Sequence, residues 1–201
     1  MIPAATVMLV LAMIAFTRNI GGDPMRWTSA VLTCAFYGLI IWCYVRRGPA
    51  VATSRSVTGY VAAVAGTLLP FTIPMFRGAA PAAGQVYATT VLVLAGTAWE
   101  VWSLRSLGRS LSIIAQAREV VDRGPYRWIR HPLYAGEIVS VLGIAISVGT
   151  PGAFAVWLTF CGQQAYRALR EEEILLQALP GYRAYRARTG ALFPAPARRR
   201  G

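Results

Sequence analysis

The chain has 201 residues, of which 56% are hydrophobic and only 14% are charged. A soluble globular protein carries roughly 25% charged and about 45–50% apolar residues, so this composition argues against an ordinary soluble domain. The net charge of +12 comes from twenty arginines and eight acidic residues, with no lysine. Because the arginines lie between long apolar blocks and not along one polar face, we expect membrane lipids as partners and no nucleic acid.

Six stretches carry no charge or a single one, namely residues 2–17, 28–45, 57–76, 85–104, 133–149 and 152–166. A helix needs about 20 apolar residues to cross a membrane, with a range of roughly 17–25. We therefore predict an all-α, polytopic integral membrane protein with five to six transmembrane helices. The last two stretches are short and are joined by a Gly-Thr-Pro-Gly turn, so they form either two full spans or a hairpin that enters the membrane and returns.

The arginine content of the links between these stretches alternates. The links 46–56 and 105–132 and the tail from Arg167 are rich in arginine, whereas the links 18–27 and 77–84 and the turn 149–152 hold fewer arginines or none. The positive-inside rule then places both termini in the cytoplasm, with the two long polar segments on that same side. We expect a multi-pass protein of the bacterial inner membrane.

Several familiar sites are absent from the sequence. It contains no Gly-x-Gly-x-x-Gly and no P-loop motif, and a single histidine with three cysteines at no ligand spacing predicts no metal site. Two acids fall inside expected spans, where a charge is costly and often functional. We expect Glu100 to be an interfacial side chain that reaches toward the headgroups, whereas Glu137 is as well explained by a polar cavity as by a structural role.

The first informative segment is residues 123–136, which reads Arg-Gly-Pro-Tyr-Arg-Trp-Ile-Arg-His-Pro-Leu-Tyr-Ala-Gly. Gly-Pro favours a turn, and Pro132 suits the first turn of a helix that begins there. His131 would then cap this helix beside free backbone N–H groups, a position that favours an anionic ligand. The alternative is a basic turn that anchors the helix to lipid.

The second informative segment is residues 167–175, Arg-Ala-Leu-Arg-Glu-Glu-Glu-Ile-Leu. Arg167 and Glu171 are four residues apart and share one face of a helix. An acid can hold a cationic or hydroxyl-bearing ligand, and an arginine can hold a carboxylate. The alternative is a solvated helix laced with ion pairs.

With these two segments the sequence resembles the isoprenylcysteine carboxyl methyltransferase family and the related phospholipid N-methyltransferases. The family's first motif is matched without a gap by Gly124, Pro125, Tyr126, Arg130, His131, Pro132, Tyr134 and Gly136. Its second motif is matched by Arg167, Glu171, Glu172 and Leu175, followed by Tyr182 and Tyr185. Residues 179–182 replace a longer run in the family, which leaves open whether Glu171 or Glu172 takes the place of a given family glutamate.

The resemblance implies an integral-membrane enzyme that uses S-adenosylmethionine. It implies that the cofactor is held by Gly124, Tyr126, Arg130, His131, Tyr134 and Glu172. It also implies two catalytic residues, Arg167 and Glu171, which orient the methyl acceptor. The chain then divides into N-terminal transmembrane helices (1–104), a methyltransferase core (105–193) and a flexible basic tail (194–201).

The expected acceptor is the carboxylate of a prenylcysteine-like or other lipophilic molecule that enters from the bilayer. A lipid amine or a small thiol is the nearest alternative acceptor. Two more distant alternatives are a membrane oxidoreductase similar to the sterol reductases and a membrane protein without enzymatic activity. The Arg-x-x-x-Glu-Glu segment argues against the oxidoreductase.

Overall fold

The computed structural model of the chain describes residues 66–76, 83–107 and 120–195, the backbone of residues 52–53 and 116–117, and the single positions 10, 34, 38, 39, 41, 42 and 45. Apart from those single positions, the expected spans 2–17 and 28–45 lie outside the described residues. The same holds for residues 57–65 of the third span and residues 196–201 of the tail.

The described elements are mostly helices, as the sequence predicts. In chain order they are β1 (Ala52–Thr53), η1 (Leu69–Met75), α4 (Ala83–Leu107), β2 (Gln116–Ala117), η3 (Gly124–Arg127), α5 (Pro132–Val148), α6 (Pro151–Ala178) and α7 (Tyr182–Arg188). The strands β1 and β2 pair antiparallel, with Ala52 opposite Ala117. This pairing, which the sequence does not predict, joins the two arginine-rich links 46–56 and 105–132.

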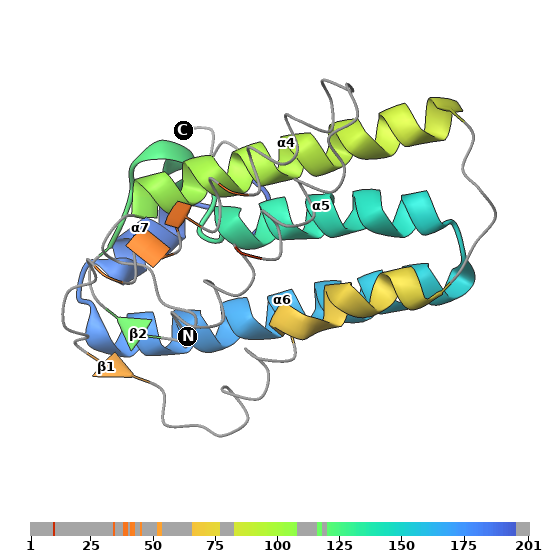
Figure 1. The fold of residues 1–201 in the computed structure, drawn as a ribbon. Coiled ribbons are helices and arrows are strands. Elements are labelled where there is room, and N and C mark those ends of the chain that lie inside the picture. The colour runs from red at the N-terminus through yellow and green to blue at the C-terminus, as the bar shows by residue number, and fades with distance from the viewer. Residues whose placement is uncertain are drawn as a thin grey trace.

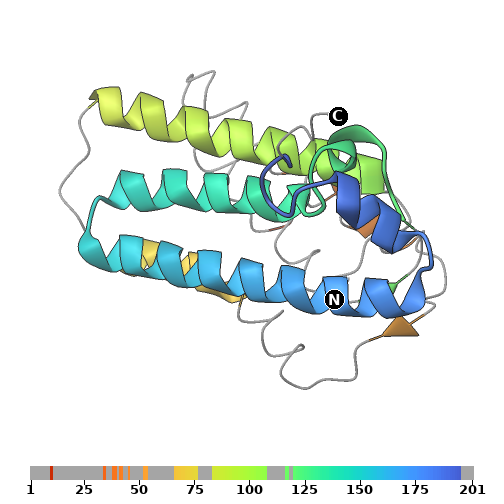
Figure 2. The ribbon, with the colours of Figure 1, turned by 180° about the vertical axis from the view of Figure 1, so that it is seen from behind.

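Helices α4, α5 and α6 lie side by side, with α5 between the other two and η1 against α6 (Figures 1 and 2). The elements α7, η3, β1 and β2 all lie at one end of this bundle, and the turn between α5 and α6 lies at the opposite end (Figure 1). Among the helices that the structure describes, none is both long enough and apolar enough to cross a membrane.

The turn between α5 and α6 forms as its residues predict. Gly149 ends α5 with a positive φ of 68°, a conformation that glycine adopts without steric cost. Thr150 caps α6 by accepting a hydrogen bond from the Ala153 N–H at 3.3 Å, and Pro151 occupies the first helical position. The helix α6 does not end with the apolar stretch at residue 166 but runs on to Ala178, so both motif glutamates lie on it.

Helices α4 and α5 approach each other closely through glycines. A Cβ atom at Gly96 would lie 2.3 Å from Ser140 Oγ, and one at Gly136 would lie 2.7 Å from Glu100 Cγ. Ser140 Oγ donates a 2.7 Å hydrogen bond to Glu100 Oε1. Glu100 is only 5% exposed. The expectation that Glu100 reaches toward the headgroups is therefore wrong, because its carboxyl group is buried between two helices.

The apolar core lies toward the end of the bundle that holds the α5–α6 turn. It consists of Ile73, Val141, Ala145, Ala153 and Phe160. The other end is polar, and there Trp99 Nε1 of α4 donates a 2.9 Å hydrogen bond to the Pro132 carbonyl at the start of α5. The apolar core packs the helices together at one end of the bundle. The polar side chains lie at the other end.

Candidate active site

The segment before α5 folds back onto α4, and Gly124 makes this possible. Its φ is +58°, and a Cβ atom there would lie 2.1 Å from Ser106 Oγ, so a larger residue fits neither the backbone conformation nor the space. Tyr126 is buried, and its carbonyl accepts a 2.7 Å hydrogen bond from the hydroxyl group of Tyr185. These contacts hold η3 in place and direct the following residues toward α6.

The predicted helix start is confirmed, since His131 is the N-cap of α5 and Pro132 is its first residue. Both His131 and the neighbouring Arg130 turn toward Glu172 on α6. Arg130 Nε donates a 2.7 Å hydrogen bond to Glu172 Oε1, and His131 Nε2 lies 3.2 Å from the same oxygen. The side chains of Arg130, His131 and Glu172 are 10%, 5% and 7% exposed, so this cluster is buried.

The surroundings of Glu172 decide its charge. Burial opposes ionisation of the carboxyl group, but the hydrogen bonds from His131 and Arg130 and the charge of Arg130 outweigh it and lower the pKa of Glu172 to about 2. The group is therefore a carboxylate throughout the physiological pH range. A permanent negative charge at this point holds both basic side chains in fixed positions.

Tyr134, in the first turn of α5, links the second pair of motif residues. Its hydroxyl group donates a hydrogen bond to Glu171 Oε1, and its ring stacks parallel to that of His131 at a centroid distance of 5.6 Å. The guanidinium carbon of Arg167 lies 4.7 Å from the centre of the Tyr134 ring, a cation–π contact. Tyr134 therefore contacts both Arg167 and Glu171.

A line of polar contacts continues from Arg167 into the bundle. Arg167 Nη1 donates a 3.0 Å hydrogen bond to Gln164 Oε1, and the amide nitrogen of Gln164 donates to Glu137 Oε2. Gln164 is fully buried. This contact gives Glu137 a buried polar partner and is compatible with both interpretations of that residue, a polar cavity and a structural role.

The C-terminal segment completes the cluster from the outside. Arg186 Nε of α7 lies 3.0 Å from Glu172 Oε2, while the Arg130 guanidinium donates to the carbonyl of Thr189. The backbone N–H groups of Arg130 and His131 donate to the carbonyls of residues 190 and 191 at 2.8 and 3.0 Å. The turn that carries both basic side chains is thus held by residues about sixty positions later in the chain.

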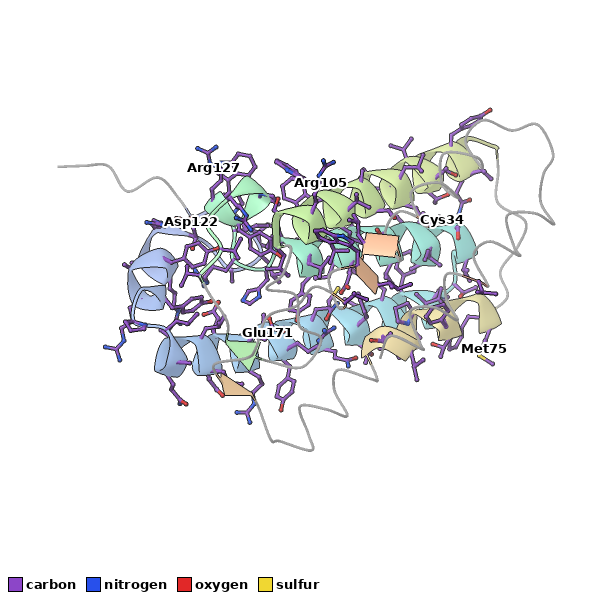
Figure 3. The ribbon with its side chains drawn as sticks, turned by 60° about the vertical axis from the view of Figure 1, so that its left-hand side comes forward. Cys34, Met75, Arg105, Asp122, Arg127 and Glu171 are labelled. Atoms are coloured by element: carbon purple, nitrogen blue, oxygen red, sulfur yellow. The ribbon has the colours of Figure 1, made fainter. Side chains whose placement is uncertain are left out.

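The structure brings six of the eight predicted site residues into one connected cluster, namely Arg130, His131, Tyr134, Arg167, Glu171 and Glu172. The other two, Gly124 and Tyr126, shape the preceding turn. Figure 3 shows Glu171 on α6, toward the end of the bundle that holds Asp122 and away from Met75. Sequence reasoning missed Arg186, which nothing distinguishes from the other arginines of a basic tail. It also missed Gln164, although an amide inside an apolar stretch, three residues before Arg167, is a usable signal.

The cluster thus consists of a buried carboxylate that holds an arginine and a histidine, with a tyrosine and a second glutamate beside them. Residues 85–180, slightly less than half of the chain, match the family described as phospholipid methyltransferase. All six clustered residues lie inside the matched segment, whereas Arg186 and residues 189–191 lie beyond it. The resemblance drawn from the two motifs is thereby confirmed. No curated protein matches the chain.

Proposed function

We propose that the protein is a membrane methyltransferase that transfers the methyl group of S-adenosylmethionine to a lipophilic acceptor. The observation that carries the proposal is the single cluster formed by the Arg-His-Pro-x-Tyr turn of α5 and the Arg-x-x-x-Glu-Glu segment of α6. These segments are more than thirty residues apart in the sequence, and both lie within the matched family segment.

The residues of the cluster fit the cofactor that the family suggests. S-adenosylmethionine carries positive ammonium and sulfonium groups and several oxygen acceptors, so its site needs both carboxylates and hydrogen-bond donors. Glu171 is the more accessible of the two clustered carboxylates, with a side chain 20% exposed against 7% for Glu172. Tyr134 and His131 stand beside it. Glu172 already faces three basic side chains, so we assign it mainly to holding Arg130 and His131 in place.

The cofactor supplies a methyl group that is already activated on a positively charged sulfur. The task of the chain is therefore alignment and exclusion of water more than acid–base chemistry. Tyr134 serves this task because it is nearly fully buried and contacts both Arg167 and Glu171. Arg167 would hold the acceptor, Glu171 would fix the cofactor side, and the Tyr134 ring would set the distance between them.

For the acceptor group we propose a carboxylate, as in prenylcysteine-like molecules. The guanidinium of Arg167 can bind a carboxylate through two parallel hydrogen bonds. A lipid amine is the second candidate, and the acids near Arg167 favour it: Glu137 joins Arg167 through Gln164, and Glu171 joins it through Tyr134. An amine must lose a proton before transfer, and Glu171 would then be the base.

The membrane location is part of the proposal and is supported by the outer faces of the helices. Large apolar residues are exposed along them, including Val86 and Val91 on α4 and Leu158 and Leu169 on α6. The pairing of β1 with β2 also brings the two arginine-rich links to one end, where the positive-inside rule puts the cytoplasm. We place both termini and the site on that side, in the inner membrane of a bacterium.

Calorimetric titration of the detergent-purified protein with S-adenosylhomocysteine tests the proposal. We expect saturable binding, and with radiolabelled S-adenosylmethionine we expect methyl transfer to one of three acceptors: a prenylated thioether carboxylate, a lipid amine or a thiol. The variant Arg170→Gln should bind and transfer like the unaltered protein, because Arg170 lies on α6 between the motif residues and its ion-pair partner in the described part of the chain is the exposed Glu173. Absence of binding by the unaltered protein would overturn the proposed function.

A further inference from the structure

Helix α7 turns one face toward the candidate active site. Tyr182 and Arg186 are four residues apart on this helix and therefore share a face. Arg186 Nε reaches Glu172 Oε2 at 3.0 Å. Tyr182 is only 3% exposed, and it lies near enough to Glu172 to be influenced by its charge.

The hydroxyl group of Tyr182 is a buried polar group without a hydrogen-bond partner among the described residues. Nearly all buried polar groups in folded proteins have a partner, so each exception calls for an explanation. The neighbouring Tyr185 shows the usual arrangement: it is 4% exposed, and its hydroxyl group donates to the Tyr126 carbonyl at 2.7 Å. The two rings are 5.7 Å apart, so the two tyrosines share one environment and differ in what their hydroxyl groups meet.

The charges around Tyr182 are those of the active site. Burial raises the pKa of its phenol well above the ordinary value, and the nearby negative charge of Glu172 raises it further, whereas Arg130 acts in the opposite direction. The phenol is therefore neutral at physiological pH, and its hydroxyl group can donate a hydrogen bond. Glu172 and Arg130 lie near enough to act on it electrostatically.

We propose that Tyr182 is a ligand-binding residue of this site, and that its hydroxyl group donates a hydrogen bond to an oxygen atom of the bound cofactor. The proposal rests on the proposed function and extends the site past residue 180, where the family match ends. Arg186 reaches Glu172 from the same face of α7.

The variants Tyr182→Phe and Tyr185→Phe test the proposal as a matched pair, because each removes one buried hydroxyl group from the same helix. For Tyr182→Phe we expect the dissociation constant for S-adenosylhomocysteine to rise about 3- to 10-fold, the range for one hydrogen bond. Its melting temperature should stay the same or rise, because a buried hydroxyl group without a partner destabilises the unliganded fold. For Tyr185→Phe we expect the reverse, a lower melting temperature with an affinity close to that of the unaltered protein.

An unchanged affinity in Tyr182→Phe, while the unaltered protein binds, would overturn the role of Tyr182 and leave the proposed function standing. A fall in melting temperature in Tyr182→Phe as large as that in Tyr185→Phe would also overturn it, because the hydroxyl group would then have a structural partner. If the unaltered protein fails to bind S-adenosylhomocysteine at all, the proposed function and the role of Tyr182 fall together.

Discussion

Replacing Glu172 by glutamine should destabilise the protein by about 3 kcal/mol at neutral pH. The carboxylate meets Arg130, His131 and Arg186 at 2.7, 3.2 and 3.0 Å, and glutamine keeps its shape but removes its charge. The pKa of Glu172 is lowered from 4.5 to about 2, and at 1.36 kcal/mol per pKa unit this corresponds to about 3 kcal/mol of stability. Removing one member of a buried ion pair costs about 3–5 kcal/mol, which agrees.

The stabilisation that Glu172 provides should decrease at acid pH. Because the folded-state pKa of Glu172 lies below the unfolded value, its contribution is fully present above pH 4.5 and is lost as the pH falls toward 2. The difference in unfolding free energy between the unaltered protein and Glu172→Gln should therefore shrink between pH 6 and pH 3. Subtracting one protein from the other removes the effect of the remaining acids, which titrate in both.

Thermal unfolding in detergent, followed by tryptophan fluorescence, measures the effect. About 3 kcal/mol corresponds to a fall of about 6–12 °C in melting temperature for a chain of this size. The adjacent Glu173→Gln is the matched control: Glu173 pairs with Arg170, the side chains are 57% and 42% exposed, and such pairs contribute about 0–1 kcal/mol. A Glu172→Gln difference as small as that of the control, or one that stays constant down to pH 3, would refute the electrostatic role assigned to Glu172.

Three further predictions concern the site and the orientation of the chain. His131→Ala should weaken S-adenosylhomocysteine binding in calorimetry while the protein stays folded, and an unchanged affinity would remove His131 from the cofactor site. Arg167→Lys should retain that binding but lose on the order of 10²-fold in turnover with a carboxylate acceptor, because a small misalignment disrupts transfer; near-normal turnover would make an amine or a thiol the leading acceptor. With the native cysteines replaced, Met75→Cys should react with a membrane-impermeant reagent in sealed right-side-out vesicles. Arg183→Cys, exposed on α7 at the other end of the bundle (Figure 1), should react only after permeabilisation, and the opposite pattern would reverse the topology.

Local signals in the sequence predicted the parts of the fold that depend on neighbouring residues. Gly124, Pro132 and the turn at 149–152 each act through backbone conformation within a few positions, so their helix starts and turns could be predicted. The apolar stretch ends at residue 166, whereas α6 ends at Ala178. An apolar stretch shows how far a helix is in apolar surroundings, but it does not show where the helix ends. Arginines and glutamates are good helix formers, and the helix continues through them.

Contacts between distant segments were not predictable in the same way. Glu100 is buried because Ser140, forty residues later, supplies a hydrogen bond where two glycines let the helices meet. Arg186 contacts Glu172 from a C-terminal segment that contains many arginines. The sequence therefore offers no reason to select Arg186 from among them. The cluster itself was predicted only because the family resemblance joined two segments that helical periodicity alone leaves separate.

The hydrogen bonds from Arg130 and His131 to the carbonyls of residues 190 and 191 have a consequence for biosynthesis. A growing chain releases the Arg-His turn long before residues 190 and 191 have been added. Until then the backbone N–H groups of the turn lack these acceptors, and Glu172 lacks Arg186. A chain terminated before residue 186 would thus contain the whole matched segment 85–180 but lack these contacts to the turn and to Glu172. The turn that carries Arg130 and His131 is therefore completed only at a late stage of synthesis.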